Sequence, residues 1–229
     1  GVIGAVGLAV SGVVLAVSVG RWRNAVLLRR VLLAVVIAVV IVAPFMWPYL
    51  EVQRKEGFVR NLYQAAQSAA TPRHYLRVPP DSAVYGRTGL LRPAASAAGQ
   101  SEKGGPEREL FVGFVAMGLG LLALWQVGWH QRRVVVWPFA ALVVAGFVLS
   151  LGPDGVRPLY AWLHEHVFGF QAIRAPARFA VLVAFGCAVL AAFGLAGVAV
   201  RRPRLAWTLV ALMAVEYANA PLPYVDAPS

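Results

Sequence analysis

Hydrophobic residues in this chain gather in long runs that short polar segments separate. At 1.5 Å per residue, about 20 helical residues cross a hydrocarbon core roughly 30 Å thick. The pattern predicts an all-α fold, a polytopic transmembrane helix bundle forming one domain. Its expected spans are six, at residues 1–20, 31–48, 110–129, 134–151, 179–200 and 205–222.

Composition supports a membrane protein, because 59% hydrophobic residues exceed what an ordinary soluble domain carries. Cys187 is the only cysteine, so the chain can form no internal disulfide. No Gly-rich phosphate loop, nucleophile elbow or metal-ligand spacing is present, and we expect no metal and no cofactor.

Arginines mark which side of the membrane each polar segment occupies. Three short segments contain nine arginines and no acidic residue: Arg21, Arg23, Arg29 and Arg30; Arg132 and Arg133; and Arg201, Arg202 and Arg204. The positive-inside rule predicts that these segments are cytoplasmic. Residues 50–109 and 152–178, and both ends of the chain, are then extracytoplasmic.

The net charge of +11 is largely explained by these segments. The remaining bases and acids nearly balance, so the excess indicates topology and attraction to anionic membrane lipids rather than nucleic-acid binding. We therefore expect membrane lipids as partners and no nucleic acid.

Both extracytoplasmic loops contain segments that favour amphipathic helices lying at the membrane interface. Apolar residues recur at helical spacing over residues 51–70, and again from Leu159 to Val167. Residues 92–106, rich in Ala, Ser and Gly, predict a flexible loop. In the fifth span, alanines repeat every fourth residue from Ala180 to Ala196, and we expect this stripe to pack closely against another span.

The candidate chemistry lies at the start of that span. Arg174 and Arg178 flank a helix N-terminus, whose free N–H groups together with guanidinium groups suit a lipid phosphate or pyrophosphate. The alternative is that both arginines simply reach the lipid headgroups.

Three further residues are candidates for the same site. His164 and His166 could contact a phosphate or move a proton, or they could be polar residues at a wet interface. Glu216 lies within the sixth predicted span, where a carboxylate usually faces a cavity or a partner. Alternatively, the span ends near Val215 and Glu216 is in water.

The second extracytoplasmic loop resembles a stretch of bacterial GT-C-type glycosyltransferases and YfhO-like membrane proteins. The similar features are Leu151-Gly152-Pro153, the patch from Leu159 to Leu163, and Arg174-x-Pro176-x-Arg178-Phe179. The segments PYLEVQRKEGFVRNL and ERELFVG look like the same group, and the resemblance covers about residues 44–199.

This resemblance implies a glycosyltransferase-like protein of the bacterial cytoplasmic membrane that uses a polyprenyl-phosphate-linked sugar donor on the outer face. Such enzymes usually place a catalytic acid in their first outer loop. This chain has no matching acidic motif after its first span, so we expect it to be the later part of a longer protein that lacks the catalytic loop. A transporter or flippase of lipid-linked intermediates, or a non-catalytic membrane scaffold, remains the alternative.

Overall fold

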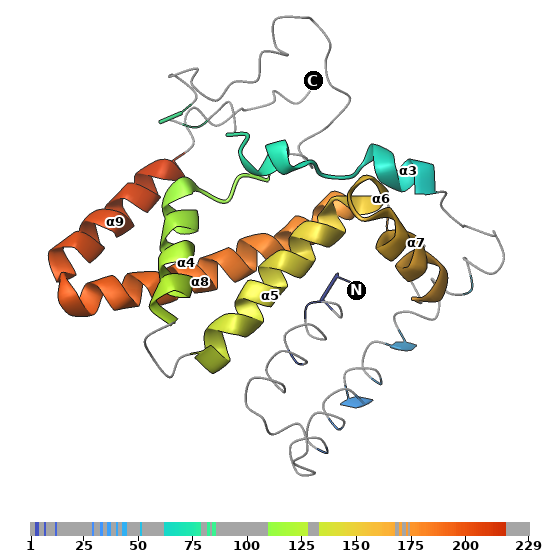
Figure 1. Ribbon diagram of the computed structural model, residues 1–229, viewed down its shortest axis with the longest axis horizontal. Coiled ribbons are helices and arrows are strands. Elements are labelled where there is room, and N and C mark those ends of the chain that lie inside the picture. The colour runs from blue at the N-terminus through green and yellow to red at the C-terminus, as the bar shows by residue number, and fades with distance from the viewer. Residues whose placement is uncertain are drawn as a thin grey trace, which may run out of the picture.

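The computed structural model describes residues 62–78, 82, 84–85, 110–127, 133–167, 170, 173 and 175–218, with isolated positions between residues 3 and 51. These residues form seven α-helices and two 3-10 helices, and contain no sheet (Figure 1). The all-α prediction is therefore confirmed for the described part of the chain. The first two predicted spans and the expected flexible loop at 92–106 lie largely or wholly outside it.

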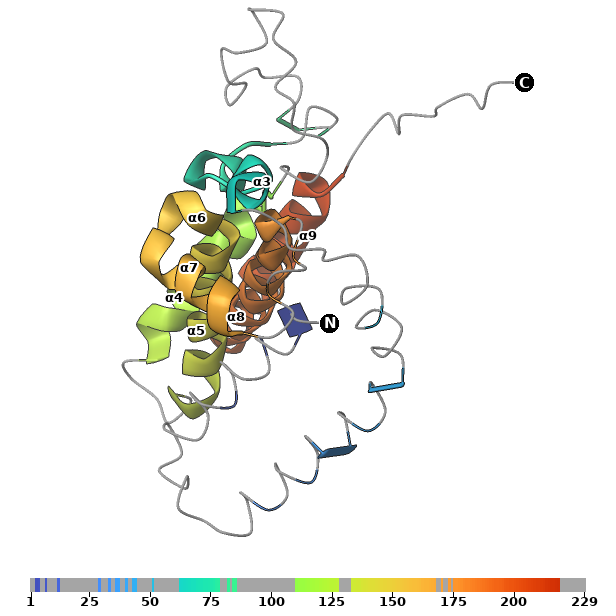
Figure 2. The same ribbon diagram turned by 90° about the vertical axis from the view of Figure 1, so that its right-hand side faces the viewer.

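Four long helices form the body of the molecule: α4 (Phe114–Val127), α5 (Arg133–Ser150), α8 (Ala180–Arg201) and α9 (Pro203–Glu216). Each runs roughly opposite to the one before it, and α8 contacts the other three (Figures 1 and 2). At one end, which we call the arginine end, α8 and α9 meet at Arg201 and Arg202. At the other, the covered end, smaller helices lie over the termini of the long ones.

Only one described helix reaches membrane length. Residues Pro176–Arg201 are long and apolar enough to cross a bilayer, whereas α4 and α5 contain shorter apolar helices. The fifth predicted span therefore coincides with a helix that is long and apolar enough to cross a membrane. The described residues do not show the six spans that the sequence predicted. The sixth predicted span is shorter than expected, because α9 ends at Glu216.

Glycine, rather than alanine, brings α8 close to its neighbours. A methyl group at Gly194 would overlap the Leu119 carbonyl oxygen of α4, and one at Gly186 would lie 2.6 Å from Val143 Cγ2 of α5. Such approaches are possible only without a side chain.

The expected alanine stripe behaves differently. Ala180 is buried, but Ala184, Ala188, Ala192 and Ala196 are exposed. The prediction that this stripe packs closely against another span is wrong. The residue spacing was correct for a smooth helix face, but α4 and α5 pack against a different face of α8.

Segments from both predicted outer loops build the covered end. They are α3 (Leu62–Gln67), η1 (Pro72–Tyr75), α6 (Gly152–Gly155), α7 (Arg157–His166) and η5 (Pro176–Phe179). Backbone hydrogen bonds join them to α5, from Ala70 N to Ser150 O (2.8 Å), and to one another, from Ala177 N to Ser68 O (3.3 Å). Gly152 has a φ of +59°, which favours glycine, and a Cβ there would lie only 3.0 Å from Ala69 Cβ and 3.3 Å from Pro176.

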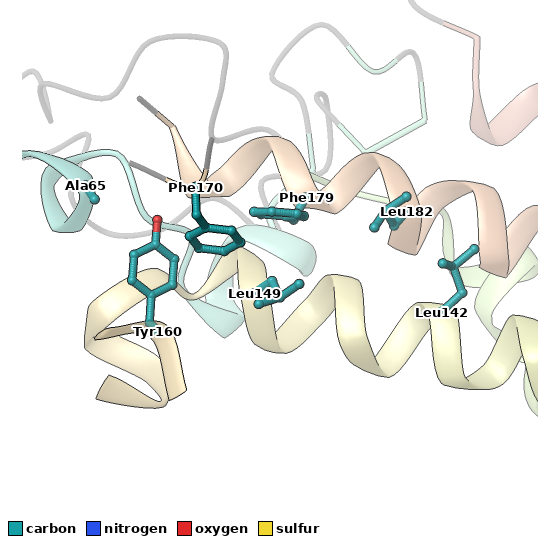
Figure 3. Close-up of a cluster of buried hydrophobic side chains, with 7 residues drawn as sticks. All are labelled: Ala65, Leu142, Leu149, Tyr160, Phe170, Phe179 and Leu182. Atoms are coloured by element: carbon teal, nitrogen blue, oxygen red, sulfur yellow. The ribbon is translucent and has the colours of Figure 1, made fainter. Parts of the chain in front are cut away.

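An aromatic and aliphatic cluster fills the space beneath this cover (Figure 3). Phe170 and Phe179 stack with ring centroids 5.8 Å apart, and Tyr160 of α7 meets Phe170 edge-on at 5.3 Å. Leu149 and Leu182 connect the cluster to α5 and α8. The predicted interfacial helix near residue 159 is thus a helix, α7, that buries Tyr160 and exposes Leu159 and Trp162. Of the segment 51–70, the structure describes little beyond α3.

Candidate functional site at the covered end

Arg178 lies in η5, the turn that leads into α8, and its side chain is exposed. Its proposed companion, Arg174, lies outside the described residues. The backbone amides of this turn are partly occupied, because Ala177 N donates to Ser68 O and Arg178 N donates to Ala175 O. A phosphate here would therefore depend on guanidinium groups more than on the free N–H groups expected from the sequence.

Two large apolar side chains continue the line of Arg178 along α8. Val181 and Phe185 follow it by three and seven residues, which places all three on one side of a helix. Both are exposed, at 59% and 57%. This arrangement is complementary to an anionic lipid. The cation lies where the charged head would be, and the apolar stripe lies where the hydrocarbon tail would be.

The two candidate histidines belong to different faces of α7. His166 is exposed, and its ring stacks on Trp162 with centroids 5.2 Å apart and planes 14° apart. Its Nδ1 lies 3.0 Å from the Trp162 carbonyl oxygen, so a hydrogen bond there requires the proton on Nδ1. His164 is half-buried.

Glu216 is the fourth described candidate, and it is 4% exposed. Its Oε1 accepts hydrogen bonds from Phe114 N (2.7 Å) and from the Tyr85 hydroxyl (3.1 Å), and its Oε2 accepts one from Val115 N (3.1 Å). A carboxylate at a helix N-terminus satisfies amides that have no partner within the helix. Glu216 thus caps α4 from the end of α9. It faces a partner, as one interpretation of the sequence required, and that partner is the protein itself.

Two residues near Glu216 were not singled out from the sequence. Gly113 has a φ of +90°, and a side chain there would lie 2.9 Å from the Tyr217 hydroxyl. Tyr85 packs edge-on against Phe111 and Phe114, and burial followed by its hydrogen bond to Glu216 raises the pKa of its hydroxyl. In the sequence, the position of Gly113 just before an apolar run is a signal that could have singled it out. Nothing in the sequence around Tyr85 indicates that its hydroxyl bonds Glu216.

Two buried tyrosines of the covered end differ in their hydrogen bonding. The Tyr75 hydroxyl lies 2.6 Å from Ser150 Oγ, and burial raises its pKa despite the opposing effect of that bond. The Tyr160 hydroxyl is buried with no hydrogen-bond partner, and burial raises its pKa to about 12.

The candidates do not converge on one cluster. Among residues 62–78, 84–85, 110–127, 133–167 and 175–218, no ion pair joins Glu216 to Arg178, His164 or His166. Within the same part of the chain, no group of three His, Cys, Asp or Glu residues is placed to hold a metal ion.

A groove lies beside this region, between α4, α8 and α9. It encloses about 580 Å³ and is lined by Phe111, Val112, Ala116, Ala184, Ala188, Ala191, Ala192, Leu195, Val210, Met213 and Tyr217. Three exposed alanines of the stripe, Ala184, Ala188 and Ala192, are among these lining residues. Among the described residues that line it, Tyr217 has the one polar side chain, and its hydroxyl donates to the Val112 carbonyl oxygen.

The covered end therefore offers an exposed arginine above an apolar stripe, a capped carboxylate and a neighbouring apolar groove. Comparisons with models of protein families, with curated proteins and with solved structures found no match.

Proposed function

We propose that this chain is part of a multi-pass protein of the bacterial cytoplasmic membrane that acts on polyprenyl-phosphate-linked sugars at the extracytoplasmic face. In this proposal the protein is a glycosyltransferase of the GT-C type, as the resemblance of the second outer loop implies. The described part of the chain contributes to binding of the lipid phosphate. The catalytic acid belongs to another part of the protein.

The observation that carries this proposal is the stripe formed by Arg178, Val181 and Phe185. An exposed guanidinium at the first turn of the membrane-length helix, followed by two exposed apolar side chains, fits a phosphate joined to a hydrocarbon chain. Guanidinium groups bind phosphate through paired, charge-assisted hydrogen bonds.

Aromatic residues support a membrane position for the bundle. Three exposed tryptophans lie toward the arginine end, at Trp125 in the last turn of α4, Trp137 near the start of α5 and Trp207 near the start of α9. Trp162 and Tyr217 are exposed toward the covered end. Tryptophan and tyrosine prefer the two membrane–water interfaces.

Glu216 weakens the transporter alternative. A transporter favours charged residues near the middle of the membrane, where broken helices expose them to substrate. Glu216 instead ends α9, and both of its oxygens are bonded to protein donors. This arrangement supports a role in holding α9 to α4.

Arg178→Ala in the full-length protein tests the proposal through binding of undecaprenyl phosphate to protein in nanodiscs. A desolvated, charge-assisted contact is worth about 1.5–3 kcal/mol, so affinity should fall about ten-fold or more. Arg178→Lys should recover only part of the loss, because lysine lacks the bidentate fork. Arg157→Ala is the matched control, since Arg157 is also exposed at the covered end but lies on α7.

If wild type, Arg178→Ala and Arg157→Ala bind undecaprenyl phosphate with the same affinity, Arg178 does not bind the lipid phosphate. Arg178 would then simply reach the headgroups of the surrounding lipids. Equal losses in both alanine variants would indicate a general charge effect instead. Melting temperatures measured in parallel separate lost binding from lost folding.

A further inference from the structure

We infer that the turn joining α8 to α9 is a binding site for the headgroup of an anionic phospholipid. Arg201 ends α8, Arg202 forms the turn, and Arg204 lies in the first turn of α9. All three side chains are exposed. The inference rests on the proposed membrane position of the bundle, but it depends neither on the proposed glycosyltransferase activity nor on Arg178.

The charge of this turn selects an anionic partner. No acidic residue occurs in the sequence between Glu165 and Glu216. Glu216 lies at the far end of α9, about 18 Å from Arg204 along the helix, and both of its oxygens already accept hydrogen bonds. It is therefore too distant to neutralise the arginines, and an anion from outside the protein would find three guanidinium groups within four residues.

The backbone of the turn is fixed on both sides of Arg202. Its amide donates to Val198 O at the end of α8 (2.7 Å), and its carbonyl oxygen accepts from Ala206 N at the start of α9 (3.1 Å). Pro203 follows, and its ring restricts the backbone further. Only the arginine side chains need to become ordered when a headgroup binds, which lowers the entropic cost of binding.

Exposed apolar side chains beside the arginines favour a phospholipid over a soluble anion. Val200 immediately precedes Arg201 and is 83% exposed, and Trp207 is 74% exposed. Trp207 follows Arg204 by three residues, so the two side chains are neighbours on the surface of α9. A headgroup phosphate can contact the guanidinium group while the first carbons of the acyl chains lie against the indole ring, which suits the membrane–water interface.

The same charge discriminates between phospholipid classes. Phosphatidylcholine also carries a phosphate, but its headgroup ammonium would bring a positive charge close to three guanidinium groups, and like charges in contact are unfavourable. Phosphatidylglycerol carries no such cation. Guanidinium groups bind its phosphate through paired hydrogen bonds, which the single ammonium group of a lysine cannot form.

The test measures quenching of Trp207 fluorescence by brominated lipids in phosphatidylcholine vesicles that contain a minor fraction of phosphatidylglycerol. Bromine is carried near the start of the acyl chains, either by the phosphatidylglycerol or by an equal mole fraction of the phosphatidylcholine. The Trp207 signal is the difference between wild type and Trp207→Phe. We expect brominated phosphatidylglycerol to quench this signal several-fold more strongly. Because both leaflets have the same composition, the orientation of the protein does not affect the result.

Three controls separate a defined site from a general attraction of positive charge. Replacing Arg201, Arg202 and Arg204 together by Lys keeps the charge and should reduce the preference for phosphatidylglycerol, because lysine lacks the bidentate fork. Trp162, which is 55% exposed at the covered end, is the matched reporter, and the difference between wild type and Trp162→Phe should show no comparable preference. Excess soluble glycerol phosphate should leave the quenching of Trp207 unchanged, because it lacks the acyl chains.

Equal quenching of Trp207 by both brominated lipids would overturn the site and leave the membrane position intact. An undiminished preference in the lysine variant, or the same preference at Trp162, would also overturn it, because charge alone would then explain the result. Loss of quenching on adding glycerol phosphate would identify a soluble phosphate as the ligand instead. Absence of quenching by either lipid would contradict the membrane position itself. Binding of undecaprenyl phosphate at Arg178 is measured separately, so failure of that role and failure of this site are distinguishable.

Discussion

The two ends of the helix bundle are built in different ways. At the covered end, segments far apart in sequence are joined by polar contacts, such as Glu216 to Phe114, Tyr75 to Ser150 and Ala177 to Ser68. At the arginine end, Arg201, Arg202 and Arg204 are exposed. The covered end resembles the interior of a folded protein, whereas the arginine end presents charge outward.

This difference separates stability from orientation. Buried hydrogen bonds are costly to break, because each lost partner leaves a desolvated group. Exposed charges add little to stability, but they decide how a membrane protein inserts. We therefore expect substitutions at the covered end to change folding, and substitutions at the arginine end to change topology.

The largest effect should follow Glu216→Ala. The substitution leaves the amides of Phe114 and Val115 and the hydroxyl of Tyr85 without their acceptor, and each desolvated donor left unpaired costs about 1–3 kcal/mol. Glu216→Gln keeps one carbonyl acceptor and should lose less. Thermal unfolding in detergent measures both, and a wild-type melting curve for Glu216→Ala would contradict the capping role.

Gly194→Val, in the last half of α8, should have the next largest effect. The added side chain would collide with the α4 backbone at Leu119, and overpacking costs about 1–3 kcal/mol. Ala196→Val places the same side chain on an exposed position nearby and should change stability by less than about 0.5 kcal/mol. Equal melting temperatures for the two variants would show that α4 does not approach α8 at Gly194.

Tyr160→Phe should stabilise the covered end by about 1 kcal/mol, because it removes a buried hydroxyl that has no partner. The pH dependence gives a second measurement. Below pH 10 the tyrosine is neutral in both states, and between about pH 10 and 12 it ionises only in the unfolded chain, since the folded pKa is about 12. Wild type should therefore lose stability over this range relative to Tyr160→Phe, as followed by unfolding at fixed pH. An identical pH dependence for the two proteins would exclude this contribution.

The smallest effect on stability should come from the arginine end. Replacing Arg201, Arg202 and Arg204 by Gln should change the melting temperature little, because exposed charges contribute weakly. The same variant should insert in mixed orientations. A large loss of stability with unchanged topology would reverse the distinction between the two ends.

The sequence predicted the helices better than their contacts. The limits of α5 and α8 fall within a few residues of the predicted spans, because apolar runs bounded by arginine and proline mark helix ends locally. α9 ends earlier, at Glu216, which binds amides 101 and 102 residues away in sequence, and no local pattern encodes those partners.

Small residues show the same limit. The alanine and glycine positions of α8 both follow a helical repeat, so spacing alone could not tell which of them faces a neighbour. The distinction depends on where α4 and α5 cross α8, at Gly194 and Gly186. At the candidate site, Arg178 was correctly placed at the start of α8, while the contact between Tyr85 and Glu216 became visible only in three dimensions.

Cysteine accessibility at the two ends tests the membrane orientation most directly. In a Cys187→Ala background, single cysteines replace Asp154 at the covered end and Arg204 at the arginine end, both of which are exposed. Intact cells expressing the full-length protein are treated with a membrane-impermeant maleimide, before and after permeabilisation. We expect labelling at position 154 in intact cells and at position 204 only after permeabilisation. Labelling at position 204 in intact cells would contradict this orientation.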